Sequence, residues 1–135
     1  MVDDDRAANV VVGACYAFVV PRDQTVMVVD DDPAFREVVC AILDDEGYAT
    51  LSAEHGRDAI AQLTAGAHPD LLLLDLNMPV MSGWDFFAWV GASPWAETPV
   101  LLLTGSDASG FGAARVLAKS ITPDALLVAV RDRLR

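Results

Sequence analysis

Short apolar runs separated by longer amphipathic stretches dominate the chain from residue 25 onward. Four of these runs end on a polar residue, at Asp30, Asp75, Thr104 and Lys119. Apolar runs of this length without polar alternation are typical of parallel strands that are buried on both faces of a sheet. Between the runs, apolar residues recur at helical spacing. The alternation predicts an α/β fold with helices covering a parallel sheet.

The pattern predicts five strands and four helices after residue 23. The strands are expected near residues 25–30, 48–51, 70–75, 99–103 and 114–118. The helices are expected over about 33–46, 57–65, a segment from Trp84 to Val90, and 123–134. Pro33 suits the first turn of a helix behind an acidic cap at Asp31 or Asp32, and Gly47 suits its end.

The first 22 residues are predicted to be an N-terminal extension to a domain that spans residues 23–135. Apolar, β-prone residues flank Gly13 in this extension, so it either adds to the sheet edge or forms a poorly ordered tail. The acidic run at residues 3–5 argues against a secretory signal, which needs basic residues there. No apolar run reaches the roughly 18 residues of a membrane span, so no membrane insertion is expected.

The composition and net charge of the chain limit the classes of function that it can have. A chain of 135 residues with 53% hydrophobic and 21% charged residues fits one globular domain. The net charge of −11 argues against direct binding of nucleic acid or an anionic membrane. Cys15 and Cys40 lack metal-ligand spacing and fit a reducing compartment, so a cytoplasmic location is expected. His55 and His68 also lack ligand partners and are expected at the surface or in turns.

The polar residues at the strand ends suggest one site, because ligands of open α/β sheets bind outside the carboxyl ends of the strands. Asp30 and Asp31, together with Asp75, offer the oxygen ligands that Mg²⁺ prefers. Asp75 is a candidate nucleophile, since carboxylates form aspartyl phosphates. Lys119 and Thr104 offer an ammonium and a hydroxyl to a phosphoryl group, whose transfer needs positioning and charge neutralisation.

At this point the chain resembles the receiver domain of bacterial two-component response regulators, over about residues 24–135. The resemblance rests on an ordered set of motif pieces. These are Val28–Pro33 (VVDDDP), Pro69–Pro79 (PDLLLLDLNMP), Met81–Gly83 (MSG), Leu103–Gly105 (LTG) and Lys119. It implies a flavodoxin-like sheet with strand order 2-1-3-4-5 and a site at the switch point between the first and third strands.

The resemblance also implies a role for each matched residue. Asp75 would be the phosphoacceptor, with Asp30 and Asp31 as the acid pair at the metal. Asn77 would offer its backbone carbonyl to Mg²⁺, and Thr104 and Lys119 would contact the phosphoryl group. Gly105 would leave the access route to the phosphoryl group open.

Two features depart from the family pattern. Lys119 is followed by Ser120, where the family has a proline in a cis peptide that aims the lysine. A cis bond before a non-proline costs about 3 kcal/mol, so we expect either a trans bond or a strained loop. The stretch from Thr104 to Lys119 is also shorter than usual by roughly seven residues, about two helical turns.

The shortened stretch is expected to change the signalling face. Residues 105–112 (GSDASGFG) have no apolar periodicity, so the fourth helix of the family should be missing or reduced there. Val116 stands at the family's aromatic switch position and cannot act as an aromatic rotamer switch. Phe111 either partly fills the gap or simply anchors the loop.

Three functions compete. The first is a Mg²⁺-dependent phosphoacceptor that takes a phosphoryl group on Asp75 from a sensor histidine kinase or phosphotransfer protein. Because the chain ends with its last helix, we expect a single-domain switch or a phosphorelay intermediate, with self-catalysed phosphorylation and dephosphorylation at most. The second is a degenerate receiver that acts as a protein-interaction scaffold. A phosphatase is disfavoured, because Asn77 occupies the place of an acid and cannot donate a proton.

Overall fold

The computed structural model describes residues 23–105 and 116–134. Its five strands form one parallel sheet in the order β2-β1-β3-β4-β5, which confirms the predicted topology. The strands are β1 (Thr25–Val29), β2 (Ala49–Ala53), β3 (Leu71–Asp75), β4 (Val100–Thr104) and β5 (Val116–Ala118).

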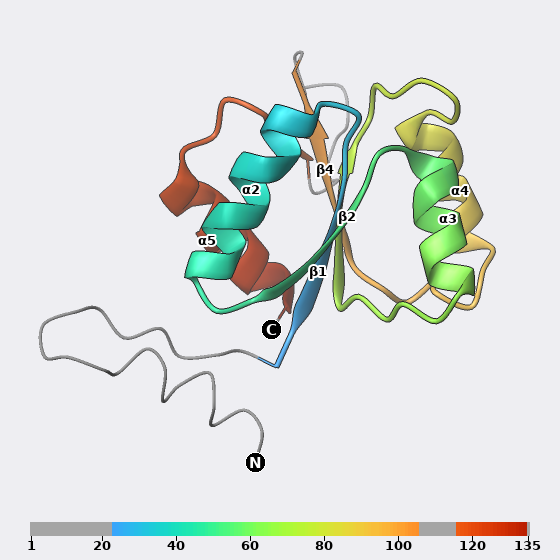
Figure 1. Ribbon diagram of the computed structural model, residues 1–135, viewed down its shortest axis with the longest axis horizontal. Coiled ribbons are helices and arrows are strands. Elements are labelled where there is room, and N and C mark those ends of the chain that lie inside the picture. The colour runs from blue at the N-terminus through green and yellow to red at the C-terminus, as the bar shows by residue number, and fades with distance from the viewer. Residues whose placement is uncertain (1–22, 106–115, 135) are drawn as a thin grey trace, which may run out of the picture.

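Helices cover both faces of the sheet, as Figure 1 shows. In the described residues these are α2 (Pro33–Asp45), α3 (Gly56–Thr64), α4 (Gly83–Gly91) and α5 (Pro123–Leu134). Helices α2 and α5 lie on one face, and α3 and α4 lie on the other (Figure 1). None of these helices is long and apolar enough to cross a membrane.

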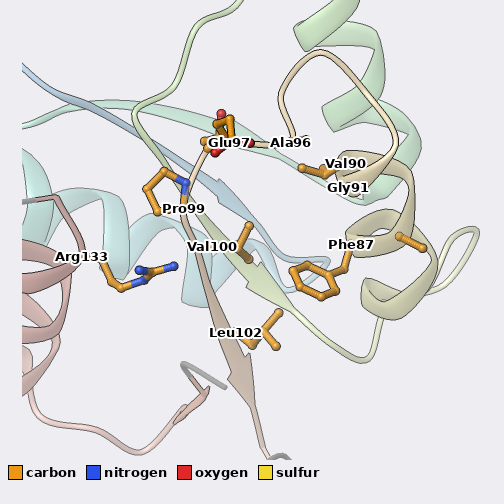
Figure 2. A pocket seen from close by; sticks show the side chains of 11 residues that line it. Phe87, Val90, Gly91, Ala96, Glu97, Pro99, Val100, Leu102 and Arg133 are labelled. Carbon is orange, nitrogen blue, oxygen red and sulfur yellow. The ribbon is translucent and has the colours of Figure 1, made fainter. Parts of the chain in front are cut away.

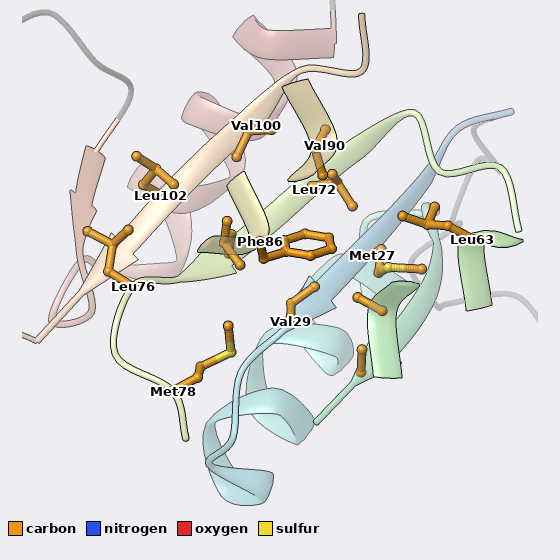
Figure 3. Packing of buried hydrophobic residues seen from close by; sticks show 13 residues of the cluster. Met27, Val29, Leu63, Leu72, Leu76, Met78, Phe86, Val90, Val100 and Leu102 are labelled. Carbon is orange, nitrogen blue, oxygen red and sulfur yellow. The ribbon is translucent and has the colours of Figure 1, made fainter. Parts of the chain in front are cut away.

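Side chains of the central strands pack into two separate cores, because successive side chains of a strand point to opposite faces. In β1, Met27 packs with the α3–α4 side and Val28 packs with the α2–α5 side. Figure 3 shows the first of these cores, in which the fully buried ring of Phe86 from α4 lies against residues of the central strands. Strands β1, β3 and β4 are therefore buried on both faces, which is what their unbroken apolar runs predicted.

The ends of α2 follow the predicted signals. The side chain of Asp32 caps the helix and accepts hydrogen bonds from the backbone N–H groups of Ala34 and Phe35 at 3.0 and 3.4 Å. Pro33 is the first helical residue, where its missing N–H costs nothing. Gly47 follows the helix with φ 100°, a conformation that glycine adopts without strain.

A few boundaries differ from the predicted ones. The second strand runs from Ala49 to Ala53 rather than 48–51, and Tyr48 instead lies buried just before it. His55 is more than a surface residue, because its Nδ1 accepts a hydrogen bond from the backbone N–H of Asp58 and caps α3. The extension at 1–22, the expected loss of a helix after Gly105 and the place of Phe111 lie outside the described residues.

Candidate functional site

Asp30 lies at the carboxyl end of β1 and is completely buried. Its Oδ1 accepts a hydrogen bond from the backbone N–H of Asp32 at 2.9 Å, and its Oδ2 lies 2.8 Å from the Nζ of Lys119. No other hydrogen-bond partner among the described residues reaches this buried Oδ2. The carboxylate is therefore held rigidly and depends on a neighbouring cation for its second oxygen.

Asp75 ends the neighbouring strand β3 and is only 2% exposed. Its Oδ1 accepts a hydrogen bond from the backbone N–H of Asn77 at 3.1 Å, and its Oδ2 lies 3.4 Å from the Nζ of Lys119. Burial raises the pKa of Asp75, the Asn77 hydrogen bond lowers it, the nearby Asp30 raises it and Lys119 lowers it. The net effect is a raised pKa, so the ionised carboxylate is stabilised less well here than in water.

Asp31 completes a cluster of three carboxylates. One carboxylate oxygen each from Asp30, Asp31 and Asp75 lies within 4.8 Å of the others. Asp31 is exposed, so the cluster is open to solvent on one side. Oxygen donors of this kind, with an open side for water, fit a small divalent cation such as Mg²⁺.

Thr104 and Lys119 reach the same edge of the sheet from β4 and the end of β5. Thr104 is buried, and its backbone carbonyl accepts a hydrogen bond from the backbone N–H of Lys119 at 2.9 Å. No cis peptide occurs in the described part of the chain, so the Lys119–Ser120 bond is trans, one of the two expected alternatives. Lys119 nevertheless reaches both buried carboxylates.

The environment of Lys119 keeps its ammonium charged. Burial lowers its pKa, but the hydrogen bond and charge of Asp30, and then those of Asp75, raise it by more. The net pKa lies above the usual value of a lysine. A fixed positive charge therefore lies between two buried carboxylates, where a charge-assisted contact is strongest.

The loop after β3 has a strained backbone that the sequence patterns did not reveal. Val80 has φ 70°, and the backbone N–H of Met81 donates to the carbonyl of Pro79 at 2.7 Å. These two features define a γ-turn of the rare, positive-φ kind. Asn77 is exposed in this loop, and its backbone is tied to Asp75 by the hydrogen bond described above.

Two more residues next to the site were missed from the sequence. Arg36 donates from Nη1 to the backbone carbonyl of Asp30 at 2.7 Å. The Nζ of Lys119 lies over the ring of Phe35, 4.7 Å from its centroid. The signal that could have found them is position, because both lie in the first turn of the helix that follows the acidic run at residues 30–32.

A large hollow lies away from this chemistry. A groove of about 970 Å³ runs between α4 and β4, and Figure 2 shows it lined by Phe87 and Val100, with Arg133 at one end. It reaches Pro99 at the amino end of β4, whereas the carboxylates lie at the carboxyl ends of the strands. A smaller cavity of about 180 Å³ borders Lys119 and Phe35 instead. The candidate reactive site is the carboxylate cluster with Lys119, because the volume of a groove does not by itself supply reactive groups.

Comparison with known proteins identifies the family. The model of the response regulator receiver domain matches residues 26–131. The DNA-binding response regulator MtrA of Mycolicibacterium smegmatis is 33% identical over 119 residues, which cover 83% of this chain and 51% of that protein. The autoinducer 1 sensor kinase/phosphatase LuxN of Vibrio harveyi is 38% identical over 85 residues, 62% of this chain and 10% of LuxN. The chain thus spans about half of MtrA and far less of LuxN.

A solved structure agrees with this assignment. The chemotaxis protein CheY4 of Vibrio cholerae superimposes with a TM-score of 0.73 at 34% identity, covering 82% of this chain and 98% of CheY4. The family match also includes every strand-end residue described above. The chain therefore belongs to the response regulator receiver domain family of two-component signalling.

Proposed function

We propose that this domain accepts a phosphoryl group on Asp75 and acts as a phosphorylation-dependent switch or relay. The observation that supports this most strongly is the contact of one ammonium with two buried carboxylates, at 2.8 Å to Asp30 and 3.4 Å to Asp75. A purely structural pair would need one carboxylate. Two carboxylates with a third nearby create excess negative charge. A bound cation would balance this charge, as in a site for phosphoryl transfer.

Mg²⁺ is the cation that fits. Asp30, Asp31 and Asp75 would hold it through carboxylate oxygens, and Asn77 through its backbone carbonyl. The bound ion would neutralise charge on the oxygens of the incoming phosphoryl group. The chain's own contribution is to hold the carboxylates rigidly, through the backbone N–H of Asp32 on Asp30 and that of Asn77 on Asp75.

The proposed reaction is a phosphoryl transfer between side chains. A carboxylate oxygen of Asp75 attacks the phosphorus of a phosphohistidine on a sensor kinase or phosphotransfer protein. The new O–P bond forms as the P–N bond breaks, and the imidazole leaves with the electron pair of that bond. Lys119 moves its contact to the transferred group, and Thr104 offers its hydroxyl from the neighbouring strand end. The phosphorylated form would then act by binding a downstream protein target.

The domain that carries this reaction would span residues 23–135, with residues 1–22 as an extension. The described elements begin at Thr25 and end at Leu134, so the sheet and its four described helices fall inside this span. Among the described residues, the side chains that carry the proposed acceptor chemistry begin at Asp30. A variant that lacks residues 1–22 should therefore fold and accept a phosphoryl group at the rate of the full chain.

Treatment with acetyl phosphate and Mg²⁺, followed by intact-mass measurement, tests the function. We expect the mass of one phosphoryl group to appear on the wild-type protein and to be lost with hydroxylamine, which cleaves acyl phosphates. Asp75→Asn should gain none, whereas Asp85→Asn, which changes an exposed carboxylate on α4, should behave as wild type. A wild-type protein that gains no phosphoryl group would favour the alternative, a degenerate receiver that works as an interaction scaffold.

A further inference from the structure

Lys119 is positioned at the site by the short edge strand β5. The described part of strand β5 is three residues long and lies at the edge of the described sheet, and Lys119 follows its last residue. One backbone hydrogen bond, to the carbonyl of Thr104, fixes the start of the side chain. A lysine side chain has four rotatable bonds beyond that point, so its ammonium needs further constraints to remain in one place.

The ring of Phe35 supplies one such constraint. It lies under the ammonium at 4.7 Å from centroid to Nζ, within the range over which a ring face attracts a cation. We propose that Phe35 is a positioning residue, which holds the Lys119 ammonium over its ring so that it faces the acceptor oxygen of Asp75. The catalytic part of this inference rests on the proposed phosphoacceptor function, whereas the positional part does not.

The helix cap ties Phe35 to the acidic pair. Asp32 accepts hydrogen bonds from the backbone N–H groups of Ala34 and Phe35, and its own backbone N–H donates to Asp30. The ring also packs against the core between α2 and α5. Its position relative to Asp30 is therefore set by short local bonds rather than by the edge strand.

A ring contact has a property that the two ion pairs lack. The charge on Asp75 changes when a phosphoryl group is attached, and the charge around Asp30 changes when a metal binds. The quadrupole of Phe35 is the same in every one of these states. The cavity of about 180 Å³ beside both residues also gives the ammonium space to move away if the ring is removed.

The test compares Phe35→Leu with Phe35→Tyr. Leucine keeps an apolar side chain in the core but has no ring face, whereas tyrosine keeps the ring. Phe87→Leu is the matched control, because Phe87 is an exposed phenylalanine on α4, away from the carboxylates. The first measurement is NMR of the Lys119 side chain, whose terminal methylene protons should be shifted upfield by the ring. The shift should persist in Phe35→Tyr and Phe87→Leu and vanish in Phe35→Leu.

The second measurement is the rate of phosphorylation by acetyl phosphate at saturating Mg²⁺. Phe35→Leu should lower the rate about three- to tenfold, as expected for loss of a partly desolvated cation–π contact. Phe35→Tyr should restore it, and the Mg²⁺ dissociation constant should stay unchanged because the carboxylates are untouched. In a Lys119→Met background, Phe35→Leu should not lower the phosphorylation rate further. A residue that acts only through Lys119 cannot affect the rate once Lys119 is gone.

The outcomes separate the two proposals. A wild-type protein with the upfield shift but no phosphorylation would overturn the function and leave the positional inference standing. Phosphorylation that falls by the same factor on Phe35→Leu whether or not Lys119→Met is also present would overturn the inference, as would a Lys119 shift that survives the loss of the ring. If the double variant does not fold, the NMR comparison of the single variants decides the matter alone.

Discussion

Val80 adopts a backbone conformation that β-branched residues rarely take. Its φ of 70° lies in the left-handed region, where the two γ-carbons crowd the backbone. Its side chain is 66% exposed, so little packing compensates for the strain. The turn that it forms carries the chain away from Asp75, and strain at such a position is commonly tolerated next to a reactive group.

Val80→Gly should raise the free energy of unfolding by about 1 kcal/mol, because glycine relieves the strain and few contacts are lost. Val128→Gly is the control, since Val128 is an exposed valine within α5 and should lose about 0.5 kcal/mol through helix propensity. Urea denaturation measures both. A decrease of the same size in both variants would contradict a strained turn at Val80.

Asp75 should destabilise the metal-free protein at neutral pH. Its pKa is raised in the folded state, mainly by burial, above the value of about 3.9 that it has when unfolded. The free energy of unfolding should therefore fall as the pH rises from the unfolded pKa through the folded one. Asp75→Asn removes this loss of stability at neutral pH, while Lys119 keeps its partner Asp30 at 2.8 Å.

We expect Asp75→Asn to be more stable than wild type at pH 7 without Mg²⁺, with the difference vanishing as the pH approaches about 4, near the unfolded pKa. Thermal or urea melts across this range measure it, with the exposed Asp23→Asn as a control that should follow wild type. A variant that is less stable at pH 7 would mean that Asp75 is held mainly by its ion pair with Lys119.

At the scale of elements, the first residue of α4 sets how closely this helix approaches the site. A Cβ on Gly83 would overlap the backbone oxygen of Asp75 and lie 2.6 Å from the Cα of Leu76. The backbone N–H of Gly83 also donates to the carbonyl of Leu76 at 3.1 Å. The start of α4 therefore packs directly on the end of β3, and only glycine leaves room for this contact.

Gly83→Ala should lower the free energy of unfolding by about 1–3 kcal/mol, because rigid backbone must move to admit the methyl group. It should also slow phosphorylation, since the displaced backbone belongs to Asp75. Gly91→Ala, at the other end of the same helix, meets no atom within 4 Å and should stabilise the protein by about 0.5–1 kcal/mol. Equal effects of the two substitutions in a denaturation series would refute the close approach.

At the scale of the whole molecule, the charge distribution favours a bound cation. The net charge is −11, and three carboxylates, two of them buried, converge at the carboxyl edge of the sheet with one lysine among them. Repulsion among these groups opposes the compact state, and a ligand that prefers the folded state offsets this by mass action. Without metal, repulsion at this site is therefore expected to lower the free energy of unfolding of the domain.

Millimolar Mg²⁺ should therefore raise the melting temperature by a few degrees, because a ligand at ten times its dissociation constant adds about 1.4 kcal/mol to the free energy of unfolding. Sodium chloride at equal ionic strength is the control, because screening alone also relieves repulsion. Asp31→Asn should reduce the specific shift while leaving the buried pair in place. An Mg²⁺ effect no larger than that of sodium, in wild type and Asp31→Asn alike, would count against a metal site.

The amino-acid sequence by itself determined the class of fold and the set of strand-end residues. Unbroken apolar runs are typical of strands buried on both faces, and their alternation with helical patterns predicts a parallel sheet with helices on each side. Because the carboxyl ends of parallel strands meet at one edge, the polar residues that follow the runs had to converge there. The confirmed strand order came from the resemblance carried by the motifs around Asp30 and Asp75, since periodicity does not specify which strands are neighbours.

Only the tertiary structure decided how those residues are held. Lys119 reaches Asp30 and Asp75 across the sheet, and Phe35 lies beneath its ammonium from a helix far earlier in the chain. The overlap that requires glycine at position 83 likewise joins a helix to a strand end. Local patterns report burial and turn preference along the chain, whereas these contacts depend on distances between distant segments, which exist only once the sheet and its helices have packed together.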